Sequence, residues 1–112
     1  MRKLITCLLL IMLGTVACKK DKSLTTKYIT LSYKQTYCAD PWAIGSNDDQ
    51  TLENVADYLE ARGLHFASLQ IKQVTPAELC LACQCKTGKT IYVSVPNSDN
   101  VKAQYQEIGF QP

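Results

Sequence analysis

The residues of this chain whose types and spacing could do chemistry are cysteines. Three of the six cysteines stand close together, as Cys80, Cys83 and Cys85, and Cys38 lies far upstream. Thiolates select soft metal ions, and four thiolates can enclose a tetrahedral ion. Because short spacings let a loop wrap an ion, these four cysteines are candidate ligands for zinc, Cu(I) or an iron–sulfur cluster.

The same four thiols support two other hypotheses. Exported proteins commonly carry structural disulfides, in which Cys38 would bond to the Cys80–Cys85 segment and one local pair would remain. A redox dithiol at Cys80 and Cys83 is the only enzymatic alternative, because a helix start near Cys80 would lower its pKa. Otherwise we expect no enzyme. Export favours disulfides whereas the spacing favours a metal, so the sequence leaves both open.

The start of the chain predicts export. Two basic residues precede an apolar run from Leu4 to Leu13, which is too short to span a bilayer, and the residues at 14–17 are small or short. This pattern is typical of a cleaved export signal. Because Cys18 follows directly, the segment resembles the signals of bacterial lipoproteins, in particular those of small exported Bacteroidota lipoproteins. The resemblance implies that residues 1–17 are a signal peptide and that Cys18 is acylated.

An acylated Cys18 would attach the chain to a membrane, because each buried methylene contributes about 0.8 kcal/mol. Residues 18–27 are polar and lack periodicity, so we expect a tether between the lipid and a domain at 28–112. Lys19 stands where enteric-type retention in the inner membrane uses an aspartate. The resemblance therefore implies the outer membrane, with the domain facing either the periplasm or the cell surface.

The charge balance bears on possible partners. Loss of Arg2 and Lys3 with the signal leaves 10 basic against 10 acidic side chains. A mature chain that is nearly neutral has no basic stripe that could neutralise phosphates, so we expect no nucleic-acid partner. The membrane and an unidentified protein remain as expected partners.

Hydrophobic spacing predicts the elements that must position the thiols. Alternating apolar residues predict strands, and apolar residues three and four apart predict helices. The segment from Thr75 to Glu78 is a capping box with proline at the first helical position, which predicts a short helix through Cys80 and Cys83. The other expected elements are strands at 28–37, 66–74 and 91–95, and helices at 48–62 and from 97 or 98 to 108, with Phe110 packing over the last helix.

These elements predict an α+β domain with a small three-stranded, mainly antiparallel sheet, two main helices on one face and a short helix that carries the cysteine cluster. The order resembles a ferredoxin-like half that lacks its final strand. In this topology the first and second strands run the same way on either side of the third. The end of the first strand then lies beside the link between the second and third strands, so we expect Cys38 to join Cys80, Cys83 and Cys85.

Two other side chains could bear on function. The single histidine, His65, is expected at the opposite end of the sheet from the cysteines, which argues against a role as a ligand. Trp42 follows Cys38 closely and could cover a metal site. A tryptophan that closes the core is the simpler interpretation of Trp42.

Overall fold

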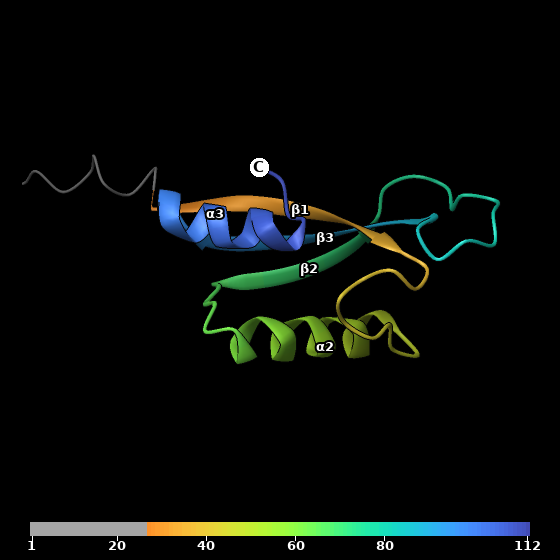
Figure 1. Cartoon of the computed structure of the whole chain (residues 1–112), viewed down its shortest axis with the longest axis horizontal. Coiled ribbons are helices and arrows are strands. Elements are labelled where there is room, and N and C mark those ends of the chain that lie inside the picture. The colour runs from red at the N-terminus through yellow and green to blue at the C-terminus, as the bar shows by residue number, and fades with distance from the viewer. Residues whose placement is uncertain (1–26) are drawn as a thin grey trace, which may run out of the picture.

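The computed structural model of this chain describes residues 27–112. The predicted signal peptide at 1–17, the acylated Cys18 and the tether up to residue 26 lie outside the described residues. The described part is α+β, with the elements β1 (Tyr28–Thr36), α2 (Asp48–Ala61), β2 (Ser68–Gln73), β3 (Lys86–Pro96) and α3 (Asp99–Ile108) in that order (Figure 1). In this part no helix has the length and apolar character needed to cross a membrane.

The three strands form one antiparallel sheet in the order β1-β3-β2. Leu31 of β1 and Leu69 of β2 both pair with Val93 in the central strand. The predicted three-stranded antiparallel sheet is therefore confirmed, with β1 and β2 running the same way on either side of β3. The connection from β2 to β3 consequently lies at the end of the sheet where β1 ends (Figure 1).

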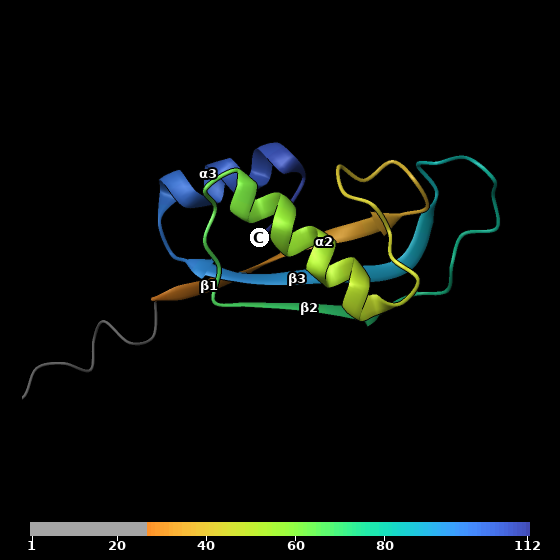
Figure 2. The same ribbon diagram turned by 90° about the horizontal axis from the view of Figure 1, so that it is seen from below.

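Apolar and polar side chains alternate along the strands, so the sheet has one buried face and one polar face. Both helices lie over the same face of the sheet (Figure 2). The buried strand residues share one core cluster with side chains from both helices. Burying one such aliphatic side chain contributes about 1.5–3 kcal/mol, so this core is a main source of stability. The fully buried members of the cluster are Leu31, Ile91, Val93 and Val95 from the strands, Val55 and Leu59 from α2, Tyr105 from α3, and Phe110.

The ends of the two helices follow the signals in the sequence. Asn47 caps α2, and its side-chain oxygen accepts a hydrogen bond from the backbone N–H of Gln50 at 2.8 Å. The helix α3 ends at Gly109, whose φ of 126° lets the chain turn back. Phe110 then packs into the core with no exposed surface, as predicted.

The predicted short helix of the cysteine cluster is wrong, because residues 74–85 connect β2 to β3 without a helix. The groups of the capping box bond to β3 instead of to each other. The Thr75 N–H donates to the Gly88 carbonyl at 3.1 Å, and the Glu78 N–H donates to the Lys86 carbonyl at 2.9 Å. The Glu78 carboxylate in turn accepts the Lys86 N–H at 3.1 Å. Pairing with a distant strand therefore overrides the local helix signal.

Candidate functional site

Four cysteines meet where β1 ends, beside the connection from β2 to β3. Cys38 is bonded to Cys83, with their Cα atoms 4.5 Å apart, and Cys80 is bonded to Cys85, with their Cα atoms 6.2 Å apart. The structure thus places Cys38 beside the other three, as the topology predicts. The pairing fits the disulfide hypothesis. The redox hypothesis required a bond between Cys80 and Cys83, and each of these residues is bonded to a different partner.

The metal hypothesis needs free thiolates at these four cysteines. A sulfur that is bonded in a disulfide is not a thiolate ligand, so the observed pairing leaves none of the four available. One ligand atom each from Glu78, Cys80 and Cys85 lies within 4.8 Å of the others. Reduction of the Cys80–Cys85 disulfide would therefore leave two thiols beside the Glu78 carboxylate. A metal site at the four cysteines is not shown and stays a prediction. His65 lies away from them, beside Tyr28 and Pro96.

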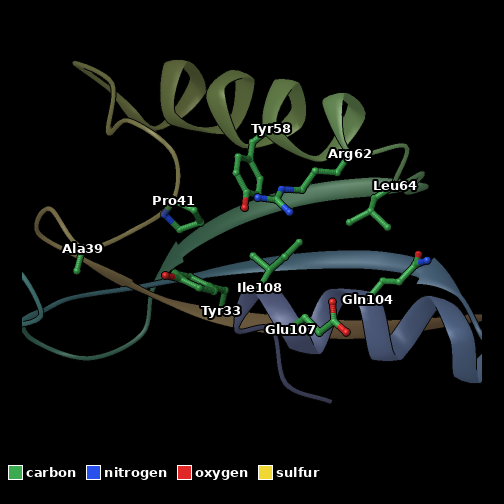
Figure 3. Close-up of a pocket in the computed structure, with 9 residues that line it drawn as sticks. All are labelled: Tyr33, Ala39, Pro41, Tyr58, Arg62, Leu64, Gln104, Glu107 and Ile108. Carbon is green, nitrogen blue, oxygen red and sulfur yellow. The ribbon is translucent and has the colours of Figure 1, made fainter.

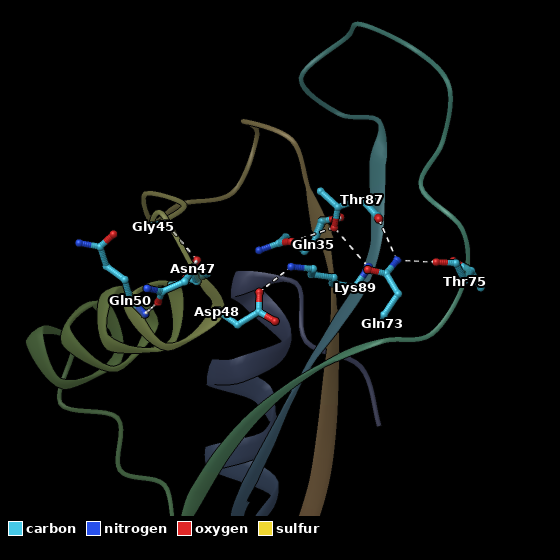
Figure 4. Close-up of polar contacts among 10 residues, drawn as sticks. Gln35, Gly45, Asn47, Asp48, Gln50, Gln73, Thr75, Thr87 and Lys89 are labelled. Carbon is cyan, nitrogen blue, oxygen red and sulfur yellow. Dashed lines mark hydrogen bonds and ion pairs between the residues drawn. The ribbon is translucent and has the colours of Figure 1, made fainter.

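The connection at residues 74–85, here called the stapled loop, is anchored at its base by polar contacts (Figure 4). The Gln73 side-chain amide donates to the carbonyl oxygens of Thr75 at 2.6 Å and Thr87 at 3.2 Å. The Thr87 hydroxyl donates to the side-chain oxygen of Gln35 at 2.8 Å. The first bond holds Thr75 of the loop to β2, and the other two connect the three strands beneath it, so the base of the loop has a defined position on the sheet.

Two leucines of the stapled loop are fully exposed to solvent. Relative to a free reference residue, the exposed area of Leu79 is 103% and that of Leu81 is 105%, whereas Cys85 is 7% exposed. Cys80 lies between the leucines and bonds to this buried cysteine. Within residues 27–112, no hydrogen bond pairs the main chain of Leu79, Cys80 or Leu81. This segment therefore offers free N–H and C=O groups beside two apolar side chains.

Sequence reasoning missed both leucines, because it assigned them to a short helix. A signal was present, since Leu79 and Leu81 flank Cys80 at a spacing of two. That spacing places both side chains on the same side of an extended chain and the cysteine on the other. The pattern is compatible with an extended segment as well as with a helix.

The turn after Cys38 is ordered by Asp40. The Asp40 carboxylate accepts hydrogen bonds from the Tyr33 hydroxyl at 2.9 Å and from the Thr36 hydroxyl at 2.7 Å. Burial raises the pKa of Tyr33 well above its ordinary value, and the bond to Asp40 raises it further. The Tyr33 phenol consequently stays protonated at neutral pH. Trp42 is buried against Tyr33 in the core, which favours the interpretation as a core residue over a cover for a metal site.

A cleft of about 600 Å³ lies between α2 and α3 (Figure 3). The guanidinium of Arg62 lies over the ring of Tyr58, 4.5 Å from its centroid, which is a cation–π contact. Aromatic, aliphatic and charged side chains from both helices line the cleft, so it offers a mixed surface for binding. The lining residues are Tyr33, Ala39, Pro41, Tyr58, Arg62, Leu64, Gln104, Glu107 and Ile108.

Comparisons with known proteins found no protein-family model, curated protein or solved structure that matches this chain. A fold by itself does not specify an activity, because the same architecture hosts unrelated functions. The function of this protein must therefore be inferred from its own surface, and the stapled loop is the feature of the described residues that departs most from an ordinary solvated surface.

Proposed function

We propose that this protein is an exported binding module that presents the stapled loop to a protein partner. The observation that carries the proposal is the full exposure of Leu79 and Leu81 in a loop closed by two disulfides. Apolar anchors that fill a partner's pocket supply much of the binding energy of an interface. A loop that is already rigid loses little entropy when it binds, so disulfides favour affinity.

The location that we propose is the cell envelope. The disulfides fit an extracytoplasmic compartment, because thiols stay reduced in the cytosol. The signal at residues 1–17 supports anchoring through an acylated Cys18, with the outer membrane as the proposed membrane. β1 begins directly after the proposed tether, and its nine residues span about 30 Å toward the stapled loop. The loop would then lie away from the membrane, which favours a protein over lipid as its partner.

A finer assignment of the fold belongs to the same proposal. The strand order β1-β3-β2 supports a relation to a ferredoxin-like half that lacks its last strand. Binding of zinc or Cu(I) by Cys38, Cys80, Cys83 and Cys85 is the competing hypothesis, and it requires that both disulfides be absent in the cell. The binding module requires that both disulfides be present.

Site-specific photo-crosslinking in cells that produce the protein tests the binding module. A photoreactive side chain is placed at Leu81 in one variant and at His65 in a matched control, because His65 is exposed at the other end of the sheet. We expect a discrete crosslinked protein from position 81 and none of the same mass from position 65. Replacement of both Cys80 and Cys85 by alanine should abolish the crosslink while the protein level is maintained.

Two outcomes would contradict the proposal. If position 81 yields no crosslinked protein, the loop has no partner under these conditions of growth and the proposal fails. If positions 81 and 65 yield the same products, the contacts are collisions at the envelope surface. In either case the exposure of the leucines would have to be explained without a partner.

A further inference from the structure

The exposed segment of the stapled loop offers the groups that a peptide presents to the cleft of an endopeptidase, namely unpaired main-chain groups and exposed apolar side chains. Such enzymes bind their substrate as an extended strand, through its free main-chain N–H and C=O groups, and take an apolar side chain into a specificity pocket. Leu79, Cys80 and Leu81 have no main-chain hydrogen bonds within the described part of the chain. The residues from Leu79 to Cys85 carry no charged side chain, so nothing in the segment opposes entry into an apolar cleft.

Both ends of this segment are held in place. On its N-terminal side, Glu78 is paired with Lys86 through two hydrogen bonds, and the Tyr37 hydroxyl donates to the Glu78 carbonyl at 3.0 Å. On its C-terminal side, the Cys38 N–H donates to the Cys83 carbonyl at 3.2 Å. A segment held in this way resists the deformation that an ordinary substrate undergoes after cleavage.

The peptide bonds of the segment differ in how many disulfides would hold their two ends together after cleavage. The bond between Leu81 and Ala82 lies between Cys80 and Cys85, and also between Cys38 and Cys83, so both disulfides cross it. The bond between Leu79 and Cys80 is crossed only by the Cys38–Cys83 disulfide. Cleavage after Leu81 would therefore leave the new ends within a six-residue ring, where the released amine stays close to the carbonyl that it left.

We propose that the stapled loop inhibits serine endopeptidases that prefer an apolar residue, with Leu81 in the specificity pocket. This inference rests on the proposed function and names the class of its partner. The enzyme's serine oxygen would bond to the Leu81 carbonyl carbon, the bond to the Ala82 nitrogen would break, and that nitrogen would take up the proton from the serine. Because both disulfides retain the amine, its nitrogen attacks the ester carbonyl carbon, the bond from that carbon to the serine oxygen breaks, and the proton returns to the serine. This restores the peptide bond faster than water hydrolyses the ester.

Inhibition assays with the full exported chain, purified in detergent, test this inference. Chymotrypsin, pancreatic elastase and subtilisin serve as enzymes with apolar specificity, and trypsin serves as the enzyme that requires a basic residue. We expect inhibition of at least one of the first three and none of trypsin. Leu81→Gly should weaken inhibition about 30-fold or more, because it leaves the specificity pocket of each enzyme empty. Leu81→Lys should transfer inhibition to trypsin, because only the side chain in the pocket changes.

Val74→Ala is the matched control, since Val74 is an exposed apolar residue of the same loop that lies outside the ring closed by Cys80 and Cys85. Its inhibition constant should equal that of the unchanged protein. After long incubation we expect partial cleavage after Leu81, seen as the added mass of one water, with two pieces that separate only on reduction. Because Leu81 is fully exposed, its variants should keep the circular dichroism spectrum of the parent.

Rapid cleavage without inhibition, or neither cleavage nor inhibition by all three apolar-specific enzymes, overturns the inference. So does inhibition that is unchanged in Leu81→Gly. The crosslinking and inhibition experiments together show whether only the protease inference fails or the proposed binding module fails as well. If photo-crosslinking from position 81 succeeds while all three enzymes remain uninhibited, the partner is a protein of another class. If both experiments fail, both proposals fall.

Discussion

At the scale of single residues, Gly88 decides how closely the stapled loop can approach β3. Its φ of 86° is a conformation that side-chain-bearing residues rarely adopt, and a Cβ at this position would collide with the carbonyl oxygen of Thr75. That carbonyl is the one to which the Gln73 side chain donates. The base of the loop therefore depends on the absence of a side chain at position 88.

We expect Gly88→Ala to lower the free energy of unfolding by about 3 kcal/mol, because strain at φ and a collision with backbone act together. Gly63→Ala is the matched control. Gly63 also has a positive φ, of 71°, but a Cβ there meets nothing within 4 Å, so only about 1 kcal/mol should be lost. Urea denaturation measures both variants, and equal losses would show that the contact with Thr75 does not matter.

At the scale of elements, the stapled loop illustrates how covalent bonds replace local structure. Its capping-box residues predict a helix, but a helix of this length is marginal without packing. The disulfides and the pairing with β3 fix the same residues in an irregular path. The two bonds differ in what they constrain, because Cys38–Cys83 separates its partners by 45 residues and Cys80–Cys85 by 5.

Removing each pair should therefore cost different amounts of stability. In the chain-entropy model, replacing Cys38 and Cys83 by alanine should lower the free energy of unfolding by about 4 kcal/mol, and replacing Cys80 and Cys85 by about 2 kcal/mol. Chemical denaturation of both double variants measures the difference. A larger loss for the local pair would contradict this account.

Intact mass with and without alkylation of the unfolded parent is the companion measurement. If both disulfides are present, none of their four cysteines should be alkylated. If instead all four thiols alkylate and native mass includes an ion, the metal hypothesis replaces the disulfide one.

At the scale of the whole molecule, the sheet separates the start of the domain from its stapled loop. β1 leads from residue 28 to the end where the cysteines meet (Figure 1). Helices α2 and α3 contribute to the same core and leave a cleft between them. A lipid at Cys18 would thus hold the molecule at one end and present the loop at the other, and this arrangement gives the proposed anchor a role in display.

The anchor itself is tested by Cys18→Ser. We expect this variant to lose labelling by a fatty-acid analogue and to leave the membrane fraction, because no acyl chain remains to partition into lipid. Cys7→Ser provides the control, since Cys7 lies within the proposed signal and would be removed with it. Labelling and membrane association should persist in that variant. If both variants behave like the parent, the lipoprotein proposal is wrong.

The sequence by itself determined the strands, the two long helices and their order, because these follow from the periodicity of apolar residues and from capping residues next to them in the chain. It also placed Cys38 beside the other three cysteines, since the direction of each strand follows from that order. Only the tertiary structure decided which cysteines are bonded, because four cysteines allow three pairings and the choice depends on distances between them.

The tertiary structure also decided that Thr75 to Glu78 form no helix and that Leu79 and Leu81 are exposed. Both outcomes depend on β3, whose backbone supplies the partners of the capping residues. The exposure of a side chain, moreover, depends on how every other segment of the chain packs.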